Sequence, residues 1–214
     1  MAHRREAGRR EDLIEAATAI VRDSGFGAAS VKAVTARAGM SAGSLYSYTA
    51  GLDDLLAEVF RRIAGAEMAA VDQAVAAAEP ADATGRLIAV IEMFATRALR
   101  GGRFAWALLV EPVGRAIDEE RLIYRRGYAG ILTEIVMHGV REGEFAPQDP
   151  RITAAGLVGA IGEALAGPLA PVTIDDDVPD AIVAAITALC LRAVGARSAS
   201  DTTSRAGSAD PRGE

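Results

Sequence analysis

The sequence predicts an all-α protein, and three observations support this fold class. Alanine is abundant among the hydrophobic residues, which make up 50% of the chain, and alanine has the highest helix propensity. No segment shows the sustained alternation of β-branched and polar residues that is typical of a strand. Apolar residues instead recur at helical spacing in segments that end at glycine or proline, which predicts about nine helices.

Residues 30–48 predict two short helices joined by a tight turn. Ser30 is a suitable N-cap for the first helix, and Gly39 ends it because glycine readily adopts the left-handed conformation. Ser41 is suited to cap the second helix, which Leu45 anchors in the core. Such a helix-turn-helix is able to place its second helix in the major groove of DNA. An ordinary helical hairpin has the same spacing, so the spacing alone leaves both interpretations open.

Several residues of this stretch are suited to contacts with DNA. Small residues at the start of the second helix allow a close approach to base edges and phosphates, and hydroxyl groups reach phosphate oxygens. The candidate DNA-binding residues are Ser30, Lys32, Ser41, Ala42, Gly43, Ser44, Tyr46, Ser47 and Tyr48.

This stretch and its flanks resemble the DNA-binding domain of the TetR (tetracycline-repressor-like) family of bacterial regulators, over about residues 10–60. Residue types and spacings agree together. The matching residues are Ala38, Gly39, Met40, Ser41, Gly43, Ser44, Leu45, Tyr46, Tyr48, Asp53, Leu55 and Leu56. The resemblance implies an N-terminal three-helix helix-turn-helix domain, followed by a helical domain for ligand binding and dimerisation.

Three residues depart from the family pattern. Thr35 and Thr49 stand where the family usually has alanine and phenylalanine, and Leu52 replaces a lysine that anchors a DNA phosphate in relatives. The departures leave the predicted fold unchanged, but they put the affinity for DNA and the placement of the next helix in question.

Composition and patterning divide the chain into four regions. Residues 1–8 are predicted to be a flexible basic arm, 9–51 the helix-turn-helix domain, 52–196 the ligand-binding and dimerisation domain, and 197–214 a disordered tail. Helices are expected at about residues 9–23, 52–78, 84–101, 104–110, 118–141, 150–166 and 178–194, in addition to the two short ones. Thr84 is the expected cap of the helix that begins there.

Charge and cysteine content favour a cytoplasmic protein that binds a polyanion through its N-terminal region. Residues 1–51 carry seven Arg and Lys against five Asp and Glu, which gives this region a net charge of +2. The whole chain has a net charge of −6, so the remaining residues together carry −8. The single cysteine, Cys190, excludes an intrachain disulfide and fits a reducing compartment. The N-terminus lacks the apolar core of a signal peptide. The apolar run at residues 152–172 is better interpreted as a buried interface helix than as a membrane span.

The chain lacks the residue patterns of an enzyme. His3 and His138 are far apart, and no His or Cys pair has metal-ligand spacing. Cys190 falls on an apolar helix face, and there is no phosphate-binding glycine loop. We therefore expect neither catalysis nor a cofactor.

The aromatic residues indicate a candidate ligand pocket. Five of the ten lie between residues 94 and 128, in segments that surround the pocket in the TetR resemblance. Tyrosine and tryptophan suit an apolar ligand with a few polar groups, although the same residues also suit an ordinary core. The candidate ligand-binding residues are Met93, Phe94, Phe104, Trp106, Leu108, Glu111, Tyr124, Tyr128 and His138. Glu111 and the acidic body favour a neutral or cationic compound.

The last two predicted helices are candidates for self-association. Small residues at four-residue spacing allow close helix packing, and a homodimer through a four-helix bundle is implied mainly by the resemblance. Packing within one chain is the alternative. The candidate interface residues are Gly156, Gly159, Ala160, Ala164, Ile182, Ile186 and Leu189.

Together these patterns predict a homodimeric transcriptional repressor that a small apolar molecule releases from a palindromic DNA operator. The alternative is a helical small-molecule-binding or scaffold protein whose DNA binding is weakened by Thr49 and Leu52.

Overall fold

In the part of the chain that the computed structural model describes, residues 2–77, 82–170 and 179–196, every regular element is a helix. The all-α fold class is therefore confirmed. The elements are α1 (Ala2–Ser24), the 3-10 helix η1 (Phe26–Ala28), α2 (Val31–Arg37), the 3-10 helix η2 (Ala42–Ser47), α3 (Leu52–Ala77), α4 (Ala83–Gly101), α5 (Arg103–Leu109), α6 (Arg115–Arg141), α7 (Pro150–Leu169) and α8 (Pro179–Ala193).

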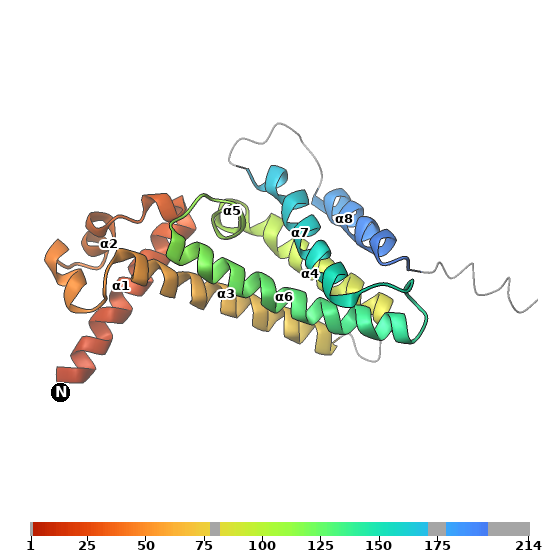
Figure 1. Cartoon of the computed structure of the whole chain (residues 1–214). Helices are drawn as coiled ribbons and strands as arrows, with labels where there is room; N and C mark the ends of the chain where they lie inside the picture. The colour runs from red at the N-terminus through yellow and green to blue at the C-terminus, as the bar shows by residue number, and fades with distance from the viewer. Residues whose placement is uncertain (1, 78–81, 171–178, 197–214) are drawn as a thin grey trace, which may run out of the picture.

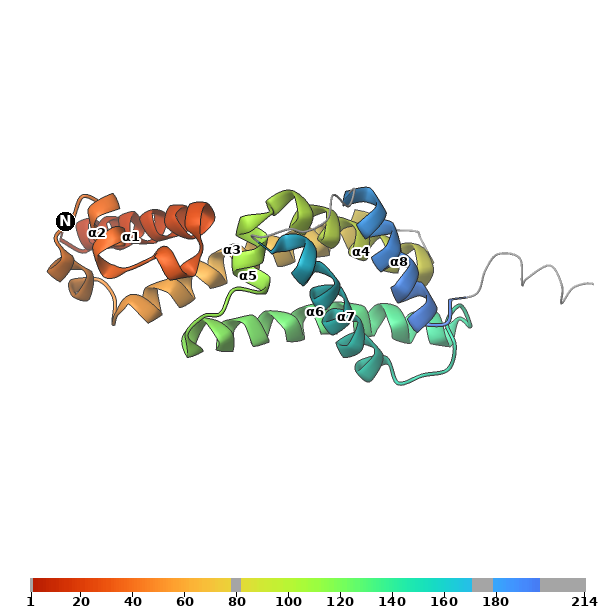
Figure 2. The ribbon, with the colours of Figure 1, turned by 90° about the horizontal axis from the view of Figure 1, so that it is seen from above.

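The molecule has a small head and a larger body. The head consists of α1, η1, α2 and η2, and it lies at one end of the molecule in both views (Figures 1 and 2). Helix α3 begins in the head and continues into the body, where α6 runs beside it. Helices α4, α7 and α8 form the rest of the body, and α5 lies close to the junction with the head.

The core of the head extends across this junction. Leu13, Val34 and Leu45 are fully buried and pack with the first turns of α3. Ala107 of α5 and Ile117 of α6 belong to the same buried cluster, so two helices of the body contribute to the core of the head. Burial of apolar surface stabilises by about 25 cal/mol per Å², and this shared burial opposes free rotation of the head.

The body has its own core, in which aliphatic residues of α4 and α7 face one another. Leu87 and Ile91 of α4 and Leu165 of α7 are fully buried there. Phe145, in the loop after α6, is also buried and lies directly over Gly139. This contact fixes the turn between α6 and α7.

Among the described helices, side-chain caps are formed at the starts of α2, α4 and α7. Ser30 Oγ accepts a hydrogen bond from Ala33 N at 3.2 Å, as the sequence predicts for α2. The expected cap of α4, Thr84, is wrong, because Asp82 Oδ1 accepts from Gly85 N at 2.7 Å and the helix begins one residue earlier than Thr84. Thr84 instead donates its hydroxyl to Glu144 in the loop after α6.

Other helix boundaries also differ from the sequence prediction. Helix α1 begins at Ala2, so the described residues of the expected arm 1–8 continue the helix. Helix α6 begins at Arg115 rather than near 118, and α7 continues through Pro168 to Leu169. The predicted tail, 197–214, lies outside the described residues.

We predict opposite effects for two glycine substitutions in α6. A Cβ on Gly139 would lie 2.3 Å from Phe145 Cδ2, whereas a Cβ on Gly130 would meet nothing within 4 Å. Gly139→Ala should therefore lower the free energy of unfolding by about 1–3 kcal/mol through overpacking. Gly130→Ala should raise it by up to about 1 kcal/mol, because alanine favours a helix more than glycine does. Urea denaturation measures both, and equal stability of the two variants would contradict this packing.

Candidate DNA-binding head and ligand cavity

The turn of the helix-turn-helix has the geometry that Gly39 permits. Gly39 has φ of 65°, and Met40 N donates to Thr35 O at 2.8 Å across the end of α2. This is the hydrogen bond of a Schellman turn, which requires the left-handed conformation at the glycine. The second short helix, η2, is a 3-10 helix rather than an α-helix. The expected cap by Ser41 is not formed, because the Ser41 hydroxyl pairs with the Ser44 hydroxyl at 2.7 Å.

Most of the candidate DNA-binding residues are exposed on the head, at the start of α2 and along η2. Leu45 is fully buried and fixes η2 against the head core, while Tyr46 beside it is 64% exposed. Ser44 and Tyr48 are half-buried. The exposed members of the set are Ser30, Lys32, Ser41, Ala42, Gly43, Tyr46 and Ser47. The surface therefore presents amide, hydroxyl and ammonium groups that are suited to phosphate oxygens.

The three departures from the family pattern are accommodated without loss of the fold. Thr35 is buried, and its hydroxyl donates to Val31 O at 2.8 Å within its own helix. The Thr49 hydroxyl donates to Gly51 O at 2.7 Å and so stabilises the turn before α3. Leu52 packs against the head core. Leu52 thus provides apolar packing at the start of α3, where the family pattern has a lysine.

A cavity of about 570 Å³ lies in the body next to the junction with the head. Its walls come from α3, α4, α5, α6 and α7, with Arg22 of α1 at the side of the head. The walls are largely aliphatic and aromatic, and the volume is within the range of about 300–1,000 Å³ that is typical of small-molecule sites.

The cavity accounts for five of the nine candidate ligand-binding residues. Phe94, Phe104, Leu108, Tyr124 and Tyr128 line it. The other four do not. Met93 and Trp106 pack against the core of the body, and His138 contacts Arg141 near the far end of α6. Glu111 lies between body and head, as described below.

Arginines are the cavity feature that the sequence analysis missed. The lining includes Arg22, Arg97, Arg100, Arg121 and Arg125 but only one acidic residue, Glu67. The charged lining residues therefore sum to +4, in a protein with a net charge of −6. The sign of this lining favours an anionic ligand, whereas the sequence analysis expected a neutral or cationic one. The pairs Arg97/Arg100 and Arg121/Arg125, at helical spacing beside aromatic residues, were the available signal.

Two polar side chains of the cavity differ in whether they have a hydrogen-bond partner within the protein. Arg97 forms a bidentate pair with Glu67, with both N–O distances at 2.7 Å. Tyr128 stacks edge-on against Phe94 at 5.2 Å between ring centroids, and burial raises the pKa of its hydroxyl. Among the described residues, no hydrogen-bond partner is found for that hydroxyl, so it remains available to a ligand.

Comparison with known proteins decides the family. Residues 13–59, which span the helix-turn-helix, match the family model described as bacterial regulatory proteins, tetR family. This part of the chain is a DNA-binding domain of the TetR family. The chain is thus a transcriptional regulator with a helix-turn-helix DNA-binding head. A search of curated protein sequences found no match.

Solved structures share the fold of this chain over most of its length. FadR from Bacillus subtilis, solved in complex with stearoyl-CoA, is 20% identical with a TM-score of 0.71, over 86% of this chain and 98% of that chain. A TetR/AcrR-family regulator from Thermobifida fusca is 24% identical with a TM-score of 0.64, over 86% and 97%. AibR, solved with isovaleryl coenzyme A and operator DNA, is 17% identical with a TM-score of 0.64, over 85% and 97%.

Glu111 connects the body of the molecule to its head. Its side chain is only 8% exposed, and its carboxylate accepts hydrogen bonds from Phe26 N at 2.8 Å and Gly27 N at 2.9 Å. Hydrogen bonds to a charged group contribute about 1.5–3 kcal/mol each. Gly25 allows the approach, because it has φ of 85° and its Cβ would lie 2.6 Å from Glu111 Oε2.

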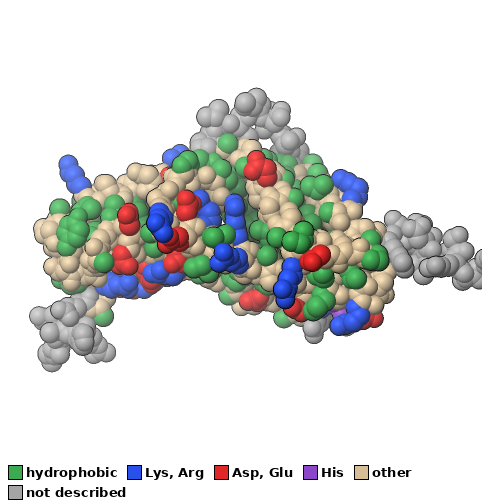
Figure 3. Space-filling view, in the orientation of Figure 1, with side chains coloured by type: hydrophobic (Ala, Val, Ile, Leu, Met, Phe, Trp, Pro, Cys, Tyr) green, Lys and Arg blue, Asp and Glu red, His purple; other side chains and the backbone are tan. Residues whose placement is uncertain are grey.

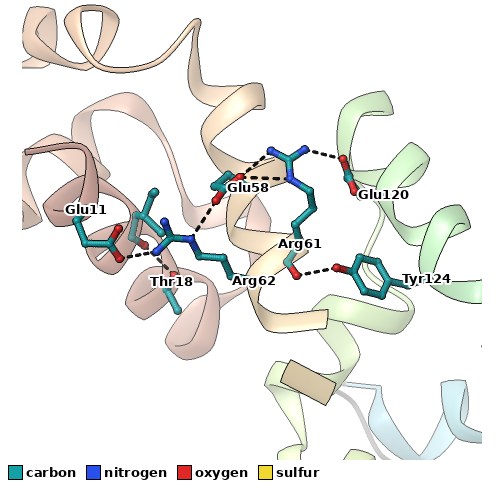
Figure 4. A network of polar contacts seen from close by, with 8 residues as sticks. Glu11, Thr18, Glu58, Arg61, Arg62, Glu120 and Tyr124 are labelled. Atoms are coloured by element: carbon teal, nitrogen blue, oxygen red, sulfur yellow. Dashed lines mark hydrogen bonds and ion pairs between the residues drawn. The ribbon is translucent and has the colours of Figure 1, made fainter. Parts of the chain in front are cut away.

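A second, more exposed network joins α1, α3 and α6 (Figure 4). Arg62 pairs with Glu11 of α1 and with Glu58, and Arg61 pairs with Glu58 at 2.8 Å and with Glu120 of α6 at 2.7 Å. The hydrogen bond from Arg61 lowers the pKa of Glu58.

The cavity touches this network through one residue. Tyr124 lines the cavity and donates its hydroxyl to Arg61 O at 2.8 Å. Charged side chains of both signs interleave over this middle part of the molecule (Figure 3). Exposed ion pairs contribute about 0–1 kcal/mol each, so the network is a weaker constraint than Glu111.

The outer face of α7 is apolar and unusually open. Ile152 is 74% exposed, and a Cβ added to Gly156 or Gly159 would meet nothing within 4 Å. By length and composition α7 is able to cross a membrane, but such a helix also occurs in the body of a soluble fold and is weak evidence. The other proposed interface residues on this helix, Ala160 and Ala164, are half-buried.

Helix α8 only partly follows the predicted interface. Leu189 is 41% exposed, and Ile182 is half-buried. Ile186 is contradicted as an interface residue, because it lies in the core of its own chain with Val183 and Cys190. Those three residues form the stripe of α8 that faces inward. Burial raises the pKa of the Cys190 thiol to about 11, so this thiol stays protonated at neutral pH.

Proposed function

We propose that this TetR-family regulator is a homodimeric repressor, and that an amphiphilic effector with an acyl chain and an anionic group releases it from a palindromic operator. The observation that carries the proposal is the arginine-rimmed apolar cavity beside the head. The repressor sense follows from the family resemblance.

The effector class follows from the two kinds of group in the cavity. Phe94, Ile91 and Val158 provide apolar wall that suits an acyl chain, and exposed arginines such as Arg100 and Arg125 suit carboxylate or phosphate groups. The structural relatives solved with stearoyl-CoA and isovaleryl coenzyme A support an acyl thioester of coenzyme A as the first class to test.

A homodimer is proposed through the outer faces of α7 and α8. The openness of Gly156 and Gly159 allows the backbone of a second α7 to approach closely, and Ile152 and Leu189 supply apolar surface around them. Two heads of such a dimer read half-sites about one helical turn apart, at roughly 34–36 Å. A small displacement of each head therefore prevents simultaneous binding of both half-sites.

We propose a division of roles on the head. Ser30, Lys32, Tyr46 and Tyr48 hold phosphates, and the small or short side chains of the remaining set face base edges. The base-facing residues are Ala42, Gly43 and Ser47, with Ser41 and Ser44 beside them at the start of η2.

The DNA contacts are tested with Lys32→Ala, and Arg141→Ala at the far end of α6 is the control. A gel shift with the promoter region next to the protein's own coding sequence should show two protomers per site. Lys32→Ala should weaken binding to all DNA sequences alike and lower the salt slope by about one unit, while Arg141→Ala changes neither. If Lys32→Ala leaves affinity and salt slope untouched, the proposed docking is wrong. Absence of any shift would favour the binding or scaffold alternative.

The cavity is tested with two neighbouring arginines of α6. Arg125 lines the cavity, whereas Arg126, which is also exposed, does not. Arg125→Ala should weaken stearoyl-CoA binding by up to about fivefold, the loss of an exposed charge pair worth about 1 kcal/mol. Arg126→Ala should bind as the wild type does. Isothermal titration calorimetry measures both affinities. Equal losses in the two variants would indicate general charge attraction and not a site at this cavity.

A further inference from the structure

Glu111 links the cavity to the head although it lies outside the cavity. Its backbone is held by α5 and α6, two helices that contribute to the cavity walls: Glu111 N donates to Trp106 O of α5 at 3.0 Å, and Arg121 of α6 donates to Glu111 O at 3.0 Å. Its carboxylate is held by the head at Phe26 and Gly27. The residue is thus attached at one end to cavity-lining elements and at the other to the turn after α1.

The body side of this link is positioned to respond to a ligand. Phe104 and Leu108 of α5 line the cavity, and Glu111 follows Leu108 by three residues. Arg121 also lines the cavity, and it donates to Leu108 O at 2.9 Å and pairs with Asp118 at 2.9 Å. A ligand that displaces α5 or draws Arg121 toward an anion therefore moves the backbone of Glu111.

The head side of the link leads to the candidate DNA surface. Phe26 and Gly27 belong to η1, which lies between α1 and α2, and Ser30, the cap of α2, follows η1 after one residue. The Phe26 ring also packs against Phe60 at 6.3 Å between centroids, and Phe60 lines the cavity. A shift of η1 therefore changes the position of α2 and of Lys32 on it.

We propose that Glu111 is the positioning residue that transmits occupation of the cavity to the head. In the empty state its carboxylate holds η1 in the orientation that binds DNA. A ligand in the cavity moves the Glu111 carboxylate and, with it, η1. The inference rests on the proposed ligand-responsive function and specifies how the cavity regulates the head. The network of Figure 4 is a poorer transmitter, because its partly exposed side chains rearrange in solvent.

Glu111→Gln tests the link, and Glu144→Gln is its matched control. Glutamine keeps one acceptor but places an NH2 group against one of the two backbone N–H groups. Glu144 has the same chemistry, since it accepts from Ala83 N at 3.1 Å and Thr84 N at 3.0 Å, but it joins the body to itself. Loss of stability alone therefore affects both variants, whereas loss of transmission affects only Glu111→Gln.

The experiment measures operator affinity with and without stearoyl-CoA as the probe, together with binding of the probe itself. In the wild type the probe should weaken operator binding roughly 5–150-fold. Glu111→Gln should still bind the probe but show almost no change in operator affinity on adding it. Glu144→Gln should keep the full response.

Two other outcomes are informative. A full response in Glu111→Gln would overturn the inference while leaving the proposed function intact. A wild type that does not respond to a bound probe would reject the ligand-responsive function, and the inference with it. Gly27→Ala perturbs the same contact from the side of the head, because the added Cβ would lie 3.3 Å from Glu111 Oε1. It should reduce the response as well, and it serves as the test if Glu111→Gln fails to fold.

Discussion

A buried carboxylate must be compensated by hydrogen bonds, and this requirement at Glu111 sets how the head sits on the body. An uncompensated charge in an apolar interior is costly, and Glu111 finds its two donors in the turn after α1. Gly25 provides the space for that approach. The head can therefore change its orientation only by keeping these hydrogen bonds or by exchanging them for water.

The other connections between head and body are softer or less specific. The ion pairs of Arg61 and Arg62 are partly exposed and tolerate rearrangement. The shared apolar cluster with Ala107 and Ile117 resists separation but has little directional preference. Helix α3 is continuous through the junction. A buried directional contact within an otherwise adaptable junction is a suitable arrangement for a small displacement that has to be transmitted.

The sequence predicted the features that depend on local chemistry. Ser30 caps α2 and Gly39 ends it, because capping and the left-handed conformation are decided by a few neighbouring residues. Features that depend on tertiary packing were not predictable. The cavity arginines come from three helices, Glu111 lies 85 residues from Phe26, and the direction in which Ile186 faces is set by the packing of α8 on α4. Periodicity located these helices without giving their rotation in the fold.

Amide hydrogen exchange at Phe26 and Gly27 tests most directly whether Glu111 holds the head in solution. Gly27 is an exposed residue, so its amide is protected only if the carboxylate accepts from it. The account predicts that both amides exchange slowly in the wild type, with an opening free energy similar to that of the buried amide of Val34 in the head core. Exchange of Phe26 and Gly27 at the rate of an unfolded chain, while Val34 stays protected, would contradict it.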